Sequence, residues 1–175
     1  KKGRAIDRYF GAATVNGSFD YIANITQCLG KRYFIKGRPG TGKSTLLKKL
    51  VKKAVDAGFE AEVYHCAFDP RSLDMLVVRE LDFCIFDSTS PHEYFPSLPT
   101  DEIIDVYEAA VEPGTDEKNA EKLTQFQHDY KEQVGKATEK LRLAKESYDR
   151  AQQTHLSRLD EAACKESAER IKSIL

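Results

Sequence analysis

A glycine-rich segment at residues 37–44 constrains the fold of this chain more than any other feature of its sequence. It reads Gly-Arg-Pro-Gly-Thr-Gly-Lys-Ser and follows a short apolar segment at 32–36. Residues 44–57 continue with apolar side chains at helical spacing and lysines between them, and Gly58 is suited to end a helix. Because glycine adopts backbone conformations that other residues avoid, the segment predicts a tight turn from a strand into a helix. Such a unit is typical of an α/β fold, in which helices cover a sheet.

The same segment matches the phosphate-binding pattern G-x-x-x-x-G-K-[ST] in full. In such a loop, consecutive backbone N–H groups surround a phosphate, and the positive end of the helix dipole faces it. Lys43 is expected to reach the β- and γ-phosphates, and Ser44 to offer its hydroxyl to Mg²⁺. The chain has no N-K-x-D guanine motif, so ATP is favoured over GTP. The alternative is a glycine-rich turn with no ligand. The residues predicted to contact the nucleotide lie in the loop and the first helical turn: Gly37, Arg38, Pro39, Gly40, Thr41, Gly42, Lys43, Ser44 and Thr45.

An apolar segment that ends in an acid supports the same chemistry. Residues 81–87 read Leu-Asp-Phe-Cys-Ile-Phe-Asp. Magnesium prefers hard oxygen ligands, so Asp87 is predicted to hold the ion, directly or through a water, together with Ser44. Many strands end in aspartate, and an ordinary strand end is the alternative. The phosphate-binding pattern upstream favours the magnesium role.

The other segments of the first two thirds predict a small parallel sheet preceded by a β-hairpin. Aromatic and β-branched residues in 8–22 flank Asn16-Gly17, a pair that favours a two-residue turn. A short crossover at 73–76 is expected to return the chain to the sheet in a parallel direction. The expected strands lie at 32–36, 61–68 and 81–86, and a further helix, entered from Thr100, lies at 101–111.

From residue 116 onward the sequence becomes highly charged and helical in character. Its apolar residues follow alternating steps of three and four: Leu123, Phe126, Tyr130, Val134, Ala137, Leu141, Ala144, Tyr148 and Ala151. This heptad stripe is typical of a helix that packs against another helix. Residues 116–175 are therefore expected to form a helical hairpin or coiled-coil appendage to a core at 1–115. The alternative is that the tail packs on its own domain and covers one face of the sheet.

Three segments of the chain carry a resemblance to known proteins: 34–45, 63–74 and 85–96. The glycine-rich loop and the strand ending at Asp87 resemble the P-loop NTPase superfamily over residues 32–90. Together, the three segments resemble a little-characterised bacterial ATPase family, sometimes labelled a nucleotide kinase, whose members carry two tandem P-loop halves. The resemblance implies the P-loop fold, ATP as the ligand, and a chain that is one half of a longer protein. It implies no particular substrate.

Polar groups that follow the predicted strands are positioned to surround a γ-phosphate. Asp69 follows the second strand, and His92 and Glu93 follow the third, at the edge where ligands bind in open α/β sheets. Asp69 and Glu93 therefore join Lys43 and Asp87 as candidate catalytic residues, with His92 or Glu93 positioning or deprotonating a nucleophile. The alternatives are that Asp69 caps a turn and that His92 and Glu93 are solvated loop residues.

Composition and charge bear on the cellular location of the protein and on the kinds of molecule that it binds. The formal net charge is −1, so the overall charge does not favour binding to nucleic acid or to an anionic membrane. No apolar stretch approaches the roughly 20 residues of a membrane span, and no signal peptide is visible. The scattered cysteines have no C-x-x-C pair, which favours free structural thiols over disulfides or a metal site and indicates a cytoplasmic protein. They are Cys28, Cys66, Cys84 and Cys164.

The sequence therefore leaves three functions open. The leading one is an ATPase that hydrolyses ATP with Mg²⁺ and couples this to a conformational change or a partner through the helical tail. The expected partner is a protein: a second P-loop half, another subunit of the same chain, or a different protein. The second possible function is that of a nucleotide or small-molecule kinase that transfers the γ-phosphate. The third is a nucleotide-dependent interaction module with little turnover.

Overall fold

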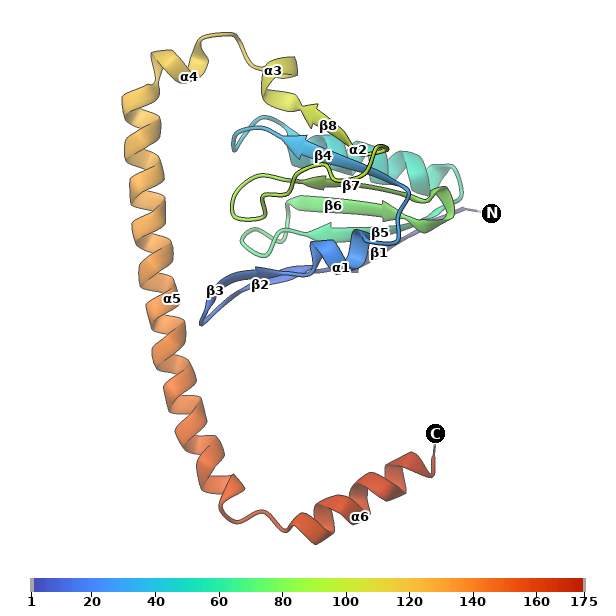
Figure 1. The fold of residues 1–175 in the computed structure, drawn as a ribbon, viewed down its shortest axis with the longest axis vertical. Helices are drawn as coiled ribbons and strands as arrows, with labels where there is room; N and C mark the ends of the chain where they lie inside the picture. Colours follow the sequence, from blue (N-terminus) through green and yellow to red (C-terminus); the bar gives the residue numbers. More distant parts are fainter. Residues whose placement is uncertain (1, 175) are drawn as a thin grey trace.

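A six-stranded mixed sheet forms the centre of the molecule, in the order β1-β5-β6-β7-β4-β8 (Figure 1). The computed structural model describes residues 2–174. The strands are β1 (Arg4–Arg8), β4 (Lys31–Lys36), β5 (Glu60–His65), β6 (Leu73–Val78), β7 (Phe83–Asp87) and β8 (Glu102–Asp105). β1 is parallel to β5, and β4 is parallel to both β7 and β8, whereas β6 is antiparallel to its two neighbours. The five other strands therefore run in one direction and end at one edge of the sheet.

The prediction of a purely parallel sheet is wrong, and β6 is the reason. Residues 73–76, expected in a crossover, begin this strand. Segment 66–72 is shorter than the dozen or so residues that a parallel crossover needs, so the chain turns back antiparallel. The turn is closed by hydrogen bonds from Ser72 N to Asp69 O and from Cys66 N to Ser72 O. After β6, a single 3-10 turn, η1 (Arg79–Leu81), reverses the chain again into β7.

The predicted N-terminal hairpin is confirmed. β2 (Gly11–Thr14) and β3 (Gly17–Asp20) pair antiparallel with Thr14 opposite Gly17, so the turn residues are Val15 and Asn16, one position before the expected Asn16-Gly17. Gly17 has a φ of 91°, a value that glycine adopts without strain. A short helix, α1 (Ile22–Thr26), follows. Strand β1, which precedes the hairpin, had no counterpart in the sequence prediction.

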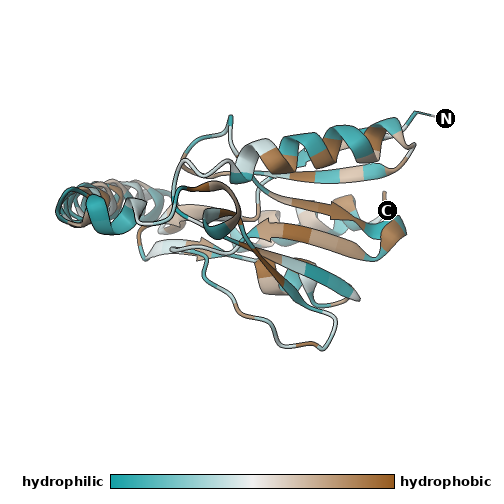
Figure 2. Ribbon diagram, turned by 90° about the horizontal axis from the view of Figure 1, so that it is seen from above, coloured by the Kyte–Doolittle hydropathy of each residue, from teal (hydrophilic) through white to brown (hydrophobic). Residues whose placement is uncertain are grey.

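The sheet is covered on both faces by residues that precede the tail. The predicted helix after the glycine-rich loop is confirmed as α2 (Lys43–Asp56), and Gly58 follows its end with a φ of 98°. Leu47 of α2 packs into one apolar cluster, which includes Ile35 and Val63 of the sheet. The hydrophobic strands lie beneath α2, which alternates hydrophobic and hydrophilic positions (Figure 2). The second cluster contains the buried side chains Phe10, Ile22, Leu29, Phe34, Tyr64, Met75, Val77, Cys84 and Phe86.

The helix predicted at 101–111 is largely replaced by strand β8 and the short helix α3 (Val106–Ala110). Two adjacent isoleucines favour a strand, and pairing with β4 supplies the backbone hydrogen bonds. The N-cap is Asp105 rather than Thr100, because the Asp105 carboxylate accepts hydrogen bonds from Tyr107 N at 2.9 Å and Glu108 N at 3.0 Å.

The tail is helical, but it does not form the predicted hairpin. It comprises α4 (Thr115–Lys118), the 37-residue α5 (Ala120–Leu156) and α6 (Glu161–Lys172). Figure 1 shows α5 standing beside the edge at which the parallel strands end, with α6 turning away from α5 instead of returning along it. Ion pairs one turn apart, such as Glu132–Lys136 at 2.6 Å and Lys145–Asp149 at 2.5 Å, support one continuous helix. Within residues 2–174, none of the helices combines the length and apolar character that a membrane crossing requires.

We predict that a chain truncated after Thr115 folds, stays soluble and melts cooperatively. The buried side chains of the described residues lie between Phe10 and Ser88, and α5 has none. The ion pair from Arg38 to Asp116 that truncation removes is exposed, and such pairs contribute about 0–1 kcal/mol. The melting temperature should therefore fall by no more than about 8 °C in calorimetry, with the full chain as control. An insoluble or molten product would mean that the tail belongs to the core.

Candidate nucleotide-binding site

The glycine-rich loop connects β4 to α2 at the edge where the parallel strands end. Gly40 and Gly42 have φ values of 86° and 94°, and Gly42 is the left-handed N-cap of α2. A Cβ atom at either position would meet nothing within 4 Å. Backbone conformation, rather than crowding, therefore requires glycine at both positions. The first N–H groups of α2 have no partner within the helix, so this turn suits an anion.

Lys43 and Asp87 converge behind this loop. The ammonium of Lys43 donates hydrogen bonds to the carbonyl of Gly37 at 2.8 Å and to that of Arg38 at 3.2 Å. It also lies 3.5 Å from Asp87 Oδ2, and the two side chains are only 10% and 19% exposed. Parallel pairing places Asp87 opposite Ile35, next to the start of the loop. The two most specific sequence predictions therefore occupy one site.

The two predicted magnesium ligands offer oxygen atoms at the same edge. Ser44 Oγ accepts a hydrogen bond from Leu73 N at 2.9 Å. Asp87 Oδ1 accepts from Thr89 N at 3.1 Å and from Thr89 Oγ1 at 2.5 Å, which orients the carboxylate. A hydroxyl and a carboxylate are hard donors that fit Mg²⁺. Thr45 lies beside Ser44 in the first turn of α2 and is exposed.

Asp74, at the start of β6, is a site residue that the sequence reasoning missed. Burial raises the pKa of its carboxyl, and the negative charge of Asp87 raises it further. The Cys66 thiol, as a hydrogen-bond partner, and the charges of His92 and Lys43 lower it in part. Asp74 therefore shares the electrostatic surroundings of Lys43 and Asp87. An acid within the apolar run 73–78 was the available signal, since acids inside apolar strands are uncommon outside functional sites and paired clusters.

A second missed feature is the network that fixes the loop after β7. The ammonium of Lys36 donates to the backbone carbonyls of Ser88 at 2.7 Å and Tyr94 at 2.9 Å. The fully buried Ser88 hydroxyl donates to Tyr94 O at 2.8 Å and accepts from Tyr94 N at 3.0 Å. The two hydrogen bonds from Lys36 thus tie residues 88–94 to the strand that leads into the glycine-rich loop, and the two between Ser88 and Tyr94 close the segment on itself.

The remaining predicted catalytic residues are engaged elsewhere. Asp69 accepts hydrogen bonds from the backbone N and the Nε of Arg71, both at 3.1 Å, and the backbone bond lowers the pKa of Asp69. Asp69 thus caps the turn, which is the alternative to a catalytic role. Glu93 is exposed and lies 3.8 Å from Lys36 Nζ. His92 Nδ1 is 2.6 Å from Asp20 Oδ2, which ties the loop to the hairpin.

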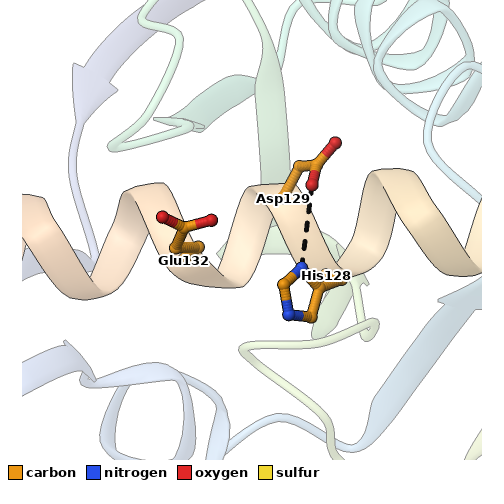
Figure 3. Close-up of side chains that lie close together, drawn as sticks. All are labelled: His128, Asp129 and Glu132. Carbon is orange, nitrogen blue, oxygen red and sulfur yellow. Dashed lines mark ion pairs between the residues drawn. The ribbon is translucent and has the colours of Figure 1, made fainter.

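One further group of ionisable side chains lies on the exposed surface of α5. His128, Asp129 and Glu132 place their ligand atoms within 4.8 Å of one another. Figure 3 shows the three on adjacent turns, with His128 Nδ1 paired to Asp129 Oδ1 at 3.7 Å. Exposed groups of this kind are common on charged helices, and we assign this one no metal.

Comparison with models of known protein families, with curated proteins and with solved structures finds no match.

We predict that Asp74→Asn raises the melting temperature at neutral pH. The raised pKa means that the folded state holds the Asp74 proton more tightly than the unfolded state, so stability falls as pH rises through the folded pKa. Asparagine does not ionise, so the gain should be largest near pH 7 and should vanish below about pH 4. Calorimetry from pH 3.5 to 8 measures this. Asp56→Asn is the control, because the Lys52 hydrogen bond lowers the pKa of Asp56; an equal gain there would contradict the assignment.

Proposed function

We propose that this chain is a P-loop ATPase that binds ATP with magnesium and hydrolyses it. The observation that carries the proposal is the 3.5 Å approach of Lys43 Nζ to Asp87 Oδ2 behind a glycine-rich loop. A cation for phosphate oxygens, an acid for a metal ion, and free N–H groups at a helix start are the parts that triphosphate binding needs. The complete G-x-x-x-x-G-K-[ST] pattern supports the same conclusion.

The residues of the loop have separable roles in this proposal. Lys43 exchanges the carbonyls of Gly37 and Arg38 for phosphate oxygens. Ser44 and Asp87 would hold Mg²⁺, which when bound neutralises charge on the phosphate oxygens. Backbone N–H groups of the loop and the start of α2 bind the remaining oxygens.

Asp74 is the proposed proton acceptor for the attacking water, because the residue before it, Leu73, donates from its backbone N to Ser44 Oγ at 2.9 Å. The water oxygen forms a bond to the γ-phosphorus, the bond from that phosphorus to the bridging oxygen breaks, and ADP and inorganic phosphate are the products. The water proton passes to the Asp74 carboxylate and then to solvent. A raised pKa brings a carboxyl closer to the operating pH, which improves a general base.

The tail is the proposed output of the reaction. Arg38 of the loop donates from Nε to Asp116 Oδ2 of α4 at 2.8 Å, and Asp116 N donates to Tyr107 Oη at 3.1 Å. Further along, Tyr130 of α5 packs against Phe68 with ring centroids 6.3 Å apart. The heptad stripe of α5 remains exposed at Tyr130, Val134 and Leu141. Such a stripe fits a protein partner, either a second P-loop half or another copy of this chain.

We predict that Lys43→Ala weakens ATP binding about 10- to 100-fold, because charge-assisted hydrogen bonds contribute about 1.5–3 kcal/mol. Titration calorimetry measures the affinity, and release of phosphate from ATP with Mg²⁺ measures turnover. Lys49→Ala, on the exposed surface of the same helix, is the control and should match the parent chain. Equal ATP binding by Lys43→Ala and the parent would refute the proposal. Phosphate transferred to an added nucleoside or nucleotide, rather than released, would assign a kinase instead.

We predict that Asp87→Asn loses the magnesium-dependent part of the activity. The neutral amide is a weaker ligand for a hard cation, so hydrolysis at limiting Mg²⁺ should fall by at least about tenfold. Binding of ATP in the presence of EDTA should change less, since Lys43 still contacts the phosphates. Asp56→Asn, at the far end of α2, serves as the control. An unchanged dependence on magnesium concentration would remove Asp87 from the metal site.

A further inference from the structure

A cavity of about 310 Å³ lies between the tip of the glycine-rich loop and the beginning of the tail. Loop residues 38–41 form one wall, Tyr107 and Val111 of the α3 region form a second, and α4 with the start of α5 forms the third. The volume falls in the range of small-molecule sites. Two of its three walls lie outside the phosphate-binding loop, and Asp74 is not among its lining residues.

Hydrogen bonds between the walls fix the shape of this cavity. Asp116 links two of them to α4, because its carboxylate accepts from Arg38 and its N–H donates to the Tyr107 hydroxyl. Asn119 Nδ2 donates to the Thr115 carbonyl at 2.8 Å, which orients the amide of Asn119. The cavity is therefore built from three elements that are joined to one another.

The lining suits a flat aromatic ring with polar edges. Phe126, Leu123 and Val111 supply apolar surface, and Phe126 is 65% exposed although it is a large aromatic side chain. Aromatic side chains stack on nucleobases, and asparagine amides pair with the amino group and ring nitrogen of adenine. Within residues 2–174, the Asn119 amide oxygen accepts no hydrogen bond, so it is available to an amino group.

We propose that this cavity holds the base of the bound nucleotide, that Phe126 stacks on it, and that Asn119 favours adenine. The inference rests on the proposed function, since the phosphates place the nucleoside. Residues 38–41 belong both to the phosphate-binding loop and to the cavity wall, so a nucleoside attached to the phosphates has a path along the loop tip. Because α4 and α5 form the third wall, the base also contacts the start of the tail.

The test compares ligands with and without a base. Titrations of the full chain use ATP, GTP and inorganic tripolyphosphate, each with Mg²⁺, on the parent, Phe126→Ala, Asn119→Ala and the control Tyr148→Ala. Tyr148 is matched to Phe126, since it lies on α5, is also 65% exposed and is outside the cavity. Phe126→Ala should weaken ATP binding roughly tenfold and tripolyphosphate binding less than about twofold. Asn119→Ala should reduce the preference for ATP over GTP, and Tyr148→Ala should match the parent.

The outcomes separate this inference from the proposed function. If ATP and tripolyphosphate bind the parent equally well, or if Phe126→Ala weakens both to the same extent, the base does not occupy the cavity and the phosphate site stands. If Phe126→Ala and Asn119→Ala both leave ATP binding unchanged, the inference is equally wrong. If the parent binds neither ligand, the proposed function and the inference fail together. Circular dichroism confirms that the variants are folded.

Discussion

The parallel pairing of β4 with β7 is the constraint on which the candidate site depends. Phe34 of β4 lies opposite Phe86 of β7, both are buried, and their ring centroids are 4.8 Å apart. This core contact sets the register that brings Asp87 level with Ile35 and within 3.5 Å of Lys43. A slip of one residue would turn Asp87 to the opposite face of the sheet. The packing of Phe34 on Phe86 therefore fixes the position of Asp87, the next residue, beside Lys43.

The reversed strand β6 gives the site a feature that a purely parallel sheet would lack. In an antiparallel strand the first residues, not the last, lie at the edge where the parallel strands end. Leu73 N thereby reaches Ser44 Oγ, and Asp74 comes under the influence of Asp87. A carboxyl whose pKa is raised by burial destabilises the folded state at neutral pH. Such local conflicts with stability concentrate at functional sites, which supports a role for Asp74 in the proposed chemistry.

Local signals in the sequence predicted the loop, α2, the hairpin, Asp87 and the helical character of the tail. Each of these depends on residues close in the chain, such as Asn16-Gly17 or the run of glycines before Lys43. The direction of β6, the edge strands β1 and β8, and the course of α5 depend on pairing between distant segments. Residues 102–105 illustrate the difficulty, because a short segment with two isoleucines fits a strand or a helix until β4 is present to pair with it. The clustering of Lys36, Ser88 and Tyr94 was equally hidden, since it forms only when the two strands lie side by side.

The attachment of the tail links the glycine-rich loop to α5 through Asp116. At about 1.5 Å per residue, the 37 residues of α5 extend roughly 55 Å. Few contacts hold this length to the core: the hydrogen bonds of Asp116 with Arg38 and Tyr107, the packing of Tyr130 on Phe68, and contacts with β2. A rotation of a few degrees at α4 would move the far end of a rigid helix by several ångströms. Since Arg38 belongs to the loop that contacts the nucleotide in the proposed function, a change that moves Arg38 alters the first of these contacts. Two nucleotide states that differ in the Arg38–Asp116 distance would then present the exposed stripe of α5 in two positions, and a partner bound to that stripe would favour one state over the other.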